Sequence, residues 1–291
     1  MAPKTQQSLL RIALPKGRMQ EGVFRLLADA GIRLQSSARQ YRPKISLPGA
    51  EVKLLKPQNI IEMLHHGSRD LGFAGADWAA ELNGNLIELL DTGLDPVRVV
   101  AAAPRELLRQ GQLPDTKLLV ASEYERLTRK WIRTRSLKAE FVRSRGATEV
   151  FPPEDSDCIV DNTATGSTLE ANGLEIVEEL MTSSTRLYAH PQALQHPKKK
   201  TAIEDFVLLL KAVLEARTRV MLELNVSDDR LESVLQVLPC MRQPTIAPLA
   251  RGGGFAVKAA IPKDRLADLL PDLKAKGGSD LVVSNFAQIV P

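Results

Sequence analysis

Hydrophobic and polar positions follow two alternating periods over the first 190 residues. Short apolar runs indicate buried strands, and apolar residues spaced three and four apart indicate helices. Strands are predicted at 10–15, 51–55, 71–74, 98–103, 117–122, 139–142 and 158–160. Helices are predicted at 20–30, where Gly31 ends the pattern, and at 59–67, 123–132 and 147–151. Strands that alternate with helices predict α/β lobes with mainly parallel sheets.

The pattern changes after His190. The stretch HPQALQHPKKK is rich in proline and lysine and predicts a connector, and a long leucine-rich helix is predicted at 203–217. Next come strand 219–226, helix 228–238, strand or turn 244–249, strand 255–262, helix 263–277 and strand 280–284. This is the order of a split βαβ, ferredoxin-like unit. We therefore expect two α/β lobes followed by a small α+β domain.

One loop of the second lobe carries candidate chemistry, in the stretch DCIVDNTATGSTLEANGL. Ligands of open α/β sheets bind beyond the carboxyl ends of the strands, and a loop is predicted there after Val160. Small residues let the backbone approach an anion, a helix N-terminus adds partial positive charge, and the hydroxyls of the loop can donate hydrogen bonds. Asp161 suits sugar hydroxyls, because a carboxylate accepts hydrogen bonds. The pattern favours a phosphorylated ribose, but it fits equally well a hydroxyl-rich turn that only caps a helix.

Two further loops follow strands of the first lobe. Lys16, Gly17 and Arg18 come directly after the first strand, where two cations and a glycine can hold a phosphate chain. A surface turn with solvated charges explains the same residues. Gly75 and Asp77 lie at the end of the strand in LGFAGADW. Three such loops predict a cleft between the lobes, and the absence of a Walker lysine disfavours transfer of the ATP γ-phosphate.

The motifs LRIALPKGR, DLGFAGAD, EYERLTRKW, GATEV and IVDNTATGSTLEANGL together resemble ATP phosphoribosyltransferase. The resemblance runs from Leu10 to Val290, and the last 80 or so residues resemble the regulatory domain of the family's long form. It implies two periplasmic-binding-protein-like lobes: 1–100, completed by about 190–210, and 101–189. A ferredoxin-like regulatory domain would span 212–291. The implied reaction joins N1 of ATP to C1′ of phosphoribosyl pyrophosphate, releases pyrophosphate and begins histidine biosynthesis.

The resemblance also implies roles for individual residues. Phosphoribosyl pyrophosphate would contact Asp161, Thr163, Ala164, Thr165, Gly166, Ser167 and Thr168. The nucleotide would contact Lys16, Gly17, Arg18, Lys56, Gly75, Asp77 and Tyr124, with Lys16 and Glu149 as catalytic candidates. Histidine, as a feedback inhibitor, would contact Asn225, Thr245, Ala260 and Asp280. Mg²⁺ as cofactor and a homo-oligomer, a dimer or hexamer, are implied as well. Asn162 stands where the family commonly has an aliphatic residue, and Lys56 where it often has arginine.

Composition narrows the remaining possibilities. The net charge is +4 and aromatic residues are 4% of the chain, which argues against a nucleic-acid surface. The two cysteines lack metal-ligand spacing, and no apolar run of 18 residues occurs, so we expect a cytoplasmic protein without a membrane span. A non-catalytic solute-binding protein and a module that only senses an amino acid are the alternatives. Neither requires two phosphate-type loops, and no general base stands out.

Overall fold

The computed structural model describes residues 10–35 and 41–290, which form two compact units. The first unit runs to Asp205, and the second starts at Phe206 and includes the short segment 29–31. The predicted boundary at residue 212 falls inside a helix and stays a prediction.

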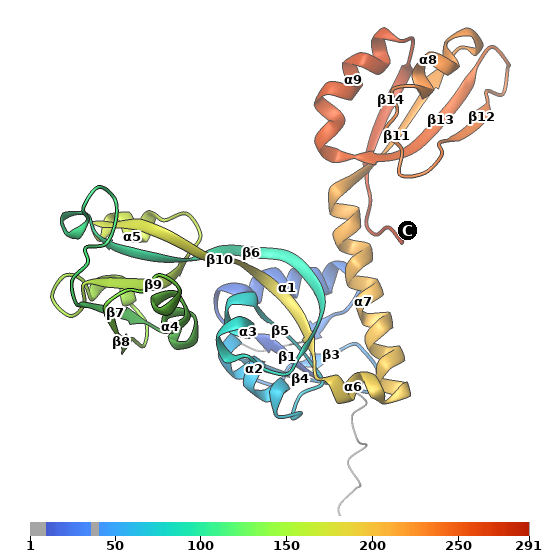
Figure 1. Ribbon diagram of the computed structural model, residues 1–291. Coiled ribbons are helices and arrows are strands. Elements are labelled where there is room, and N and C mark those ends of the chain that lie inside the picture. The colour runs from blue at the N-terminus through green and yellow to red at the C-terminus, as the bar shows by residue number, and fades with distance from the viewer. Residues whose placement is uncertain (1–9, 36–40, 291) are drawn as a thin grey trace, which may run out of the picture. The chain divides into compact units, whose positions relative to one another are not determined.

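One eight-stranded sheet forms the centre of the first unit, in the order β4-β1-β5-β10-β6-β9-β7-β8 (Figure 1). Its strands are β1 (Leu10–Pro15), β4 (Ala50–Leu55), β5 (Leu71–Gly75), β6 (Ile87–Pro104), β7 (Leu118–Ser122), β8 (Ala139–Arg143), β9 (Cys158–Thr163) and β10 (Leu174–Ala189). Strands β2 (Leu34–Gln35) and β3 (Lys44–Ile45) pair separately. Parallel strands β1, β4 and β5 build one lobe, and parallel strands β7, β8 and β9 build the other.

Two long strands, β6 and β10, join the lobes and pair with each other along much of their length (Figure 1). Both run antiparallel to their neighbours, β10 to β5 and β6 to β9. The prediction of two α/β lobes is confirmed, whereas a mainly parallel sheet is wrong at the centre. Strand β10 was not predicted from the sequence, because charged and polar residues interrupt its apolar positions.

The helices of the first unit are α1 (Arg18–Asp29), α2 (Pro57–His65), α3 (Ala76–Leu82), α4 (Glu125–Thr134) and α5 (Ser167–Ala171), with single turns at Arg105–Leu107 and Thr148–Val150. Helices α1 and α2 bury apolar faces, whereas α3 buries the carboxylates of Asp77 and Glu81. In α1 the buried residues Val23, Leu26 and Leu27 recur at helical spacing, as predicted.

The connector predicted after His190 is wrong, because two helices occupy it. Helix α6 (Pro191–Gln195) and helix α7 (Pro197–Thr218) both begin at a proline. Proline fits the first position of a helix because its missing N–H would have no intrahelical partner there. The prolines that suggested a connector therefore start helices. None of the described helices is long and apolar enough to cross a membrane.

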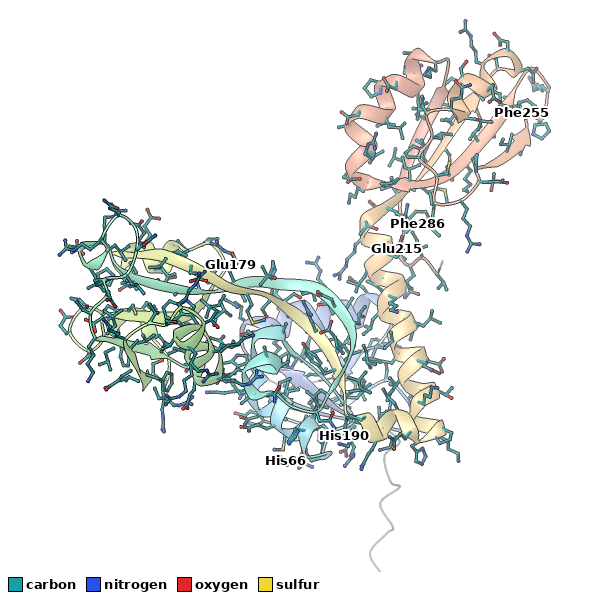
Figure 2. All side chains as sticks on the ribbon, viewed as in Figure 1. His66, Glu179, His190, Glu215, Phe255 and Phe286 are labelled. Atoms are coloured by element: carbon teal, nitrogen blue, oxygen red, sulfur yellow. The ribbon has the colours of Figure 1, made fainter. Side chains whose placement is uncertain are left out.

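The second unit has a four-stranded antiparallel sheet in the order β12-β13-β11-β14. Its elements are β11 (Arg219–Val226), α8 (Leu231–Leu235), β12 (Thr245–Pro248), β13 (Phe255–Pro262), α9 (Leu266–Ala275) and β14 (Ser279–Asn285), with single turns at Asp228–Arg230 and Lys263–Arg265. Alternate residues of β11 and β13 pack with Val234, Leu269 and Leu273 of the helices, and Phe255 packs at the margin (Figure 2). This topology confirms the predicted ferredoxin-like α+β domain.

Candidate active site

A cavity of about 380 Å³ lies at the end of β9. It is lined by Arg18, Glu123, Gly146, Thr148, Glu149, Asp161, Asn162, Thr163, Ala164, Thr165, Thr168 and Leu169. The structure thus brings Glu149 and Arg18 to most of the predicted phosphoribosyl loop. These residues come from the start of α1, the end of β7, the turn at 146–149 and the segment from β9 into α5.

Strand β9 continues to Thr163, so the loop starts three residues later than predicted. Side chains of a strand alternate between the two faces of its sheet. Cys158 and Val160 pack with Tyr124 on one face, while Ile159 packs with Leu169 on the other. Asp161 and Thr163 follow Ile159 in this alternation, and both line the cavity.

The turn between β9 and α5 is held by its own hydroxyls. The Thr163 hydroxyl accepts the Gly166 N–H at 2.9 Å, and the Thr165 hydroxyl accepts the Ser167 N–H at 3.3 Å. Gly166 has φ +91°, a left-handed conformation that is costly for residues with a Cβ. Thr163 and Thr165 therefore hold the turn, and their contact with a phosphate stays a prediction. The exposed Thr168 also lines the cavity. Helix α5 spans only five residues, so its dipole contributes little.

Three carboxylates, Glu123, Glu149 and Asp161, line the cavity with a single cation, Arg18. Burial, followed by the charges of Glu149 and Glu123, raises the pKa of Asp161 to about 6, although Asn162 N–H donates to its Oδ1 at 2.7 Å. The cavity therefore disfavours an unaccompanied anion and favours positive charge between its walls.

The backbone before Glu149 is bent by left-handed residues, Gly146 at φ +92° and Ala147 at φ 48°. The hydroxyls of Ser144 and Thr148 lie 2.8 Å apart and fix this bend. Thr148 is buried, and the single turn that it starts carries Glu149 to the cavity.

The predicted nucleotide cations gather at the ends of β1 and β4. The Lys16 N–H donates to the Leu55 carbonyl at 2.9 Å, which places Lys16 beside Lys56. The Lys16 ammonium lies 4.2 Å from the centre of the Tyr41 ring. Gly17 and Lys56 are exposed, and of these cations Arg18 lines the cavity.

The remaining predicted nucleotide residues, Gly75, Asp77 and Tyr124, are buried. Tyr124 Oη donates to Asp77 Oδ2 at 2.6 Å, and Ser183 Oγ donates to Asp77 Oδ1 at 2.7 Å. Burial and the neighbouring Asp77 carboxylate raise the pKa of Tyr124. A Cβ on Gly75 would lie 2.1 Å from Asp77 Oδ1, so glycine is needed to pack this carboxylate. Contact of these three residues with a nucleotide stays a prediction.

Comparisons with known proteins agree along the whole chain. The family model described as HisG, ATP phosphoribosyltransferase, matches residues 56–212, and the HisG C-terminal domain matches 216–288. An ATP phosphoribosyltransferase of Pelotomaculum thermopropionicum is 34% identical over 287 residues, which cover 97% of this chain and 99% of the relative. That of Desulforudis audaxviator is also 34% identical, covering 97% and 99%. The chain belongs to the ATP phosphoribosyltransferase family.

A solved ATP phosphoribosyl transferase (HisG:HisZ) complex from Thermotoga maritima supports the assignment. It is 26% identical with a TM-score of 0.63, and the match covers 71% of this chain and 98% of that one. The activity of the family is the transfer of phosphoribose to ATP, the first step of histidine biosynthesis. The alternatives of a non-catalytic binding protein and a sensor module are thereby set aside. The HisG C-terminal domain identifies the long form of the family.

Within the second unit of this ATP phosphoribosyltransferase, the four predicted histidine contacts share one face of the sheet. Val220, Leu222, Leu224 and Val226 of β11 point into the core, so Asn225 points to the open face. Asn225 Nδ2 donates to Asp280 Oδ2 at 3.0 Å. Thr245 pairs with Lys258, and Ala260 with Met221, on the same face. Their contact with histidine stays a prediction.

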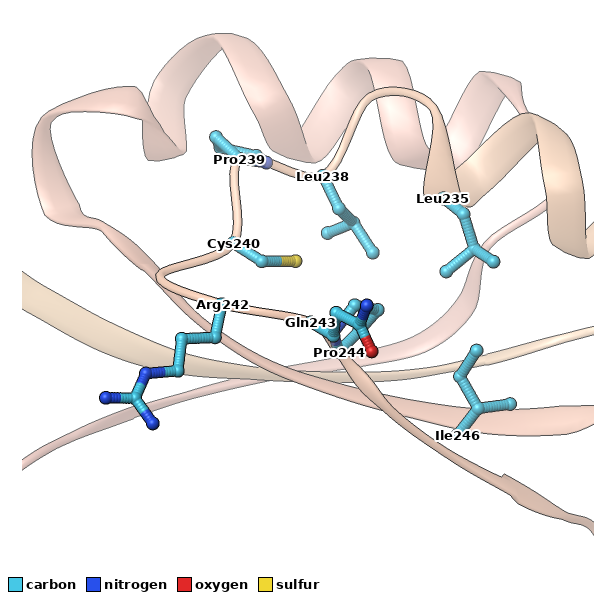
Figure 3. Close-up of a pocket in the computed structure, with 8 residues that line it drawn as sticks. All are labelled: Leu235, Leu238, Pro239, Cys240, Arg242, Gln243, Pro244 and Ile246. Atoms are coloured by element: carbon cyan, nitrogen blue, oxygen red, sulfur yellow. The ribbon is translucent and has the colours of Figure 1, made fainter. Parts of the chain in front are cut away.

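A second cavity, of about 480 Å³, lies on the other side of this sheet and contains none of the predicted residues (Figure 3). It is lined by Leu235, Leu238, Pro239, Cys240, Arg242, Gln243, Pro244 and Ile246. Arg242 points away from the leucine side chains, and the lining lacks the carboxylates and hydroxyls of the β9 cavity.

Glu123, Gly146, Thr148, Asn162 and Leu169 line the β9 cavity but were not predicted as site residues. Gly146 and Thr148 belong to GATEV, a motif that carries the resemblance, and Glu123 ends the strand region before α4. Strand-end position was therefore an available signal for Glu123. The described residues contain no group of three histidine, cysteine, aspartate or glutamate side chains that could hold a metal ion.

Proposed function

We propose that the β9 cavity binds phosphoribosyl pyrophosphate and is the place where phosphoribose is transferred to ATP. The observation that carries this proposal is a half-buried carboxylate, Asp161, beside a hydroxyl-rich turn in one cavity. Asp161 accepts hydrogen bonds from the ribose hydroxyls, and the backbone and hydroxyls of 163–168 hold the 5′-phosphate.

The reaction forms the bond between adenine N1 and C1′ and breaks the bond between C1′ and the pyrophosphate oxygen, whose electron pair leaves with pyrophosphate. Adenine N1 already carries a lone pair, so no general base is required. Positive charge develops at the ribose in an oxocarbenium-like state, and the nearby Asp161 and Glu149 carboxylates stabilise it. Positioning of the two substrates supplies much of the remaining acceleration.

Lys16 and Arg18 contact the phosphates of the nucleotide or of the departing pyrophosphate, with Gly17 and Lys56 beside them. The oxygen donors of the cavity suit Mg²⁺, which proteins commonly hold with one or two carboxylates and substrate phosphates. Asp161 and Glu149 are the side chains that would hold it. When bound, Mg²⁺ neutralises charge on the leaving pyrophosphate.

We also propose that histidine binds the open face of the second unit's sheet and lowers activity, and that the chain works as a homo-oligomer. The Asn225–Asp280 pair offers an amide and a carboxylate to the charged groups of an amino acid. An inhibitor acts through a difference in its affinity for two states, typically about 1–3 kcal/mol.

The direct test incubates the purified chain with ATP, phosphoribosyl pyrophosphate and Mg²⁺ and follows the adduct by ultraviolet absorbance. We expect adduct formation from this chain alone, and none when either substrate is omitted. Activity that requires a separate synthetase-like subunit would contradict a self-sufficient enzyme. Binding of ATP without adduct formation would contradict the proposed site.

A further inference from the structure

A chain of buried hydrogen bonds runs beneath the β9 cavity. Ser183 Oγ of β10 donates to Asp77 Oδ1 at 2.7 Å, and Tyr124 Oη donates to Asp77 Oδ2 at 2.6 Å. Asn162 Nδ2 of β9 donates to Tyr124 Oη at 2.8 Å. Asp77 is 5% exposed and Tyr124 is 0% exposed, so their polar atoms rely on these hydrogen bonds within the protein instead of on water.

This chain of hydrogen bonds reaches the cavity through strand β9. Asn162 lies opposite Val99, whose cluster contains Tyr124, whereas Asp161 lies opposite Val100, whose cluster contains Leu169. The two positions therefore face opposite sides of the sheet. The Asn162 N–H nevertheless donates to Asp161 Oδ1 at 2.7 Å, and Asn162 Nδ2 donates to the same oxygen at 3.5 Å. Anchoring the Asn162 side chain at Tyr124 therefore fixes both groups that contact the carboxylate.

At its other end, this chain of hydrogen bonds lies at the contact between α3 and α4, one helix from each lobe. The Glu81 carboxylate accepts the N–H groups of Arg126 at 2.9 Å and of Leu127 at 3.0 Å, which caps α4. The rings of Trp78 and Tyr124 lie 4.7 Å apart. This contact holds Tyr124 rigidly.

We propose that Asn162 is a positioning residue that, through Tyr124 and Asp77, holds Asp161 in the orientation that accepts the ribose hydroxyls. The inference rests on the proposed function of Asp161. It assigns Tyr124 and Asp77 an effect on phosphoribosyl pyrophosphate, because both side chains are buried and hydrogen-bonded within the chain that ends at Asn162.

The test compares Asn162→Leu, Tyr124→Phe and the double variant. In Asn162→Leu, loss of the neutral hydrogen bond to Tyr124 predicts a rise of about five- to tenfold in KM for phosphoribosyl pyrophosphate. Tyr124→Phe removes this bond and also the one to the Asp77 carboxylate, so its effect should be at least as large. We expect KM for ATP to change less than about twofold and the double variant to resemble the worse single one, since both remove the same link.

The matched control is Thr128→Val in α4. Its hydroxyl is buried without a partner among the described residues, so the change removes a polar group from the same core and leaves the chain of hydrogen bonds intact. Its KM values should match those of the unaltered protein. Circular dichroism checks the fold of each variant, and Asn162→Ser serves if Tyr124→Phe does not fold.

Three results distinguish failure of the positioning role, a nucleotide contact of Tyr124 and failure of the proposed site. If Asp161→Asn impairs the reaction but the Asn162 variants leave KM for phosphoribosyl pyrophosphate unchanged, the positioning role is wrong and the proposed site stands. A selective rise in KM for ATP in Tyr124→Phe would instead make Tyr124 a nucleotide contact. If Asp161→Asn itself keeps unaltered kinetics, the proposed site fails.

Discussion

The two units place their candidate ligand contacts in opposite surroundings. In the first unit, residues from four segments line a cavity of about 380 Å³ around the half-buried Asp161. In the second, the Asn225–Asp280 pair lies on an open sheet face, and Asp280 is exposed. The first arrangement forms a complete cavity within one unit, whereas the second supplies only one wall of a site.

This difference sets the scale of the expected effects. Charges in a water-poor cavity interact strongly, while exposed charges are screened by water and salt. Substitutions at the β9 cavity should therefore change activity by orders of magnitude. Substitutions on the open face should tune inhibition by small factors.

The largest effect is expected for Asp161→Asn. Hydrogen bonds to a charged group contribute about 1.5–3 kcal/mol each, so loss of the carboxylate should lower kcat/KM for phosphoribosyl pyrophosphate about 100-fold or more. The same substitution should stabilise the fold at neutral pH. A carboxyl whose pKa rises to about 6 on folding favours the folded state below its unfolded value, and that advantage is lost as pH rises through 6.

Thermal unfolding at several pH values checks the stability half of this prediction. Above pH 6 the variant should be more stable than the unaltered protein, by up to about 3 kcal/mol, and the difference should vanish below about pH 4. Equal stability of the two proteins at all pH values would show that folding does not raise the pKa of Asp161.

Gly166→Val should have the next largest effect. A Cβ at Gly166 would meet only Ile176 Cδ1, at 3.7 Å, so the chain itself leaves room for a side chain. The cost comes from φ +91°, which penalises residues with a Cβ by about 1–2 kcal/mol. The substitution should change the shape of the turn. KM for phosphoribosyl pyrophosphate should therefore rise more than KM for ATP.

Gly173→Val is a matched control for backbone strain. Gly173 has φ +71° and open space at its Cβ, but it follows α5 and lies outside the turn between β9 and α5. It should lose comparable stability in thermal unfolding while both KM values stay unchanged. A similar rise of KM for phosphoribosyl pyrophosphate in both variants would mean that lost stability, and not the shape of the turn, explains the effect.

The sequence predicted strands best where they are buried in the core. Strand β1 has the predicted bounds because all its residues pack inside or nearly so, and β11 and β13 also match. Strand β10 escaped prediction because backbone pairing with β5 and β6 holds it, and its first half is only partly buried. Apolar patterning carries no signal for a strand held in that way.

Site residues within one short sequence motif were also predicted, whereas residues that the fold brings to the cavity were missed. Asp161 and the residues 163–168 lie in one short motif, so they were predicted together. Glu123 and Thr148 come to the cavity through tertiary packing, and the register of β9 places Asn162 beside Tyr124. A one-residue shift in register would turn each side chain to the other face, and sequence alone does not set the register.

Thr168→Ala should have a smaller effect than the two cavity changes above. Its exposed hydroxyl lines the cavity, and loss of one hydrogen bond to a phosphate predicts about a tenfold rise in KM for phosphoribosyl pyrophosphate. Stability should change little, because Thr168 lies on the surface. Thr134→Ala, at the exposed end of α4, is the control and should leave steady-state kinetics unaltered.

The smallest effect is expected on the open face, for Asp280→Gly. Asp280 has φ 50°, which glycine adopts freely, but glycine loses the hydrogen bond from Asn225, so stability should change by less than about 0.5 kcal/mol. Removing the exposed carboxylate should weaken histidine binding by about two- to tenfold, because Asp280 offers the acid that pairs with the ammonium group. Calorimetric titration of histidine into this variant, with Thr245→Ala as a neighbour on the same face, measures the change. Tighter binding in Asp280→Gly would show that the carboxylate repels the inhibitor, and no heat in the unaltered protein would leave the domain without a histidine site.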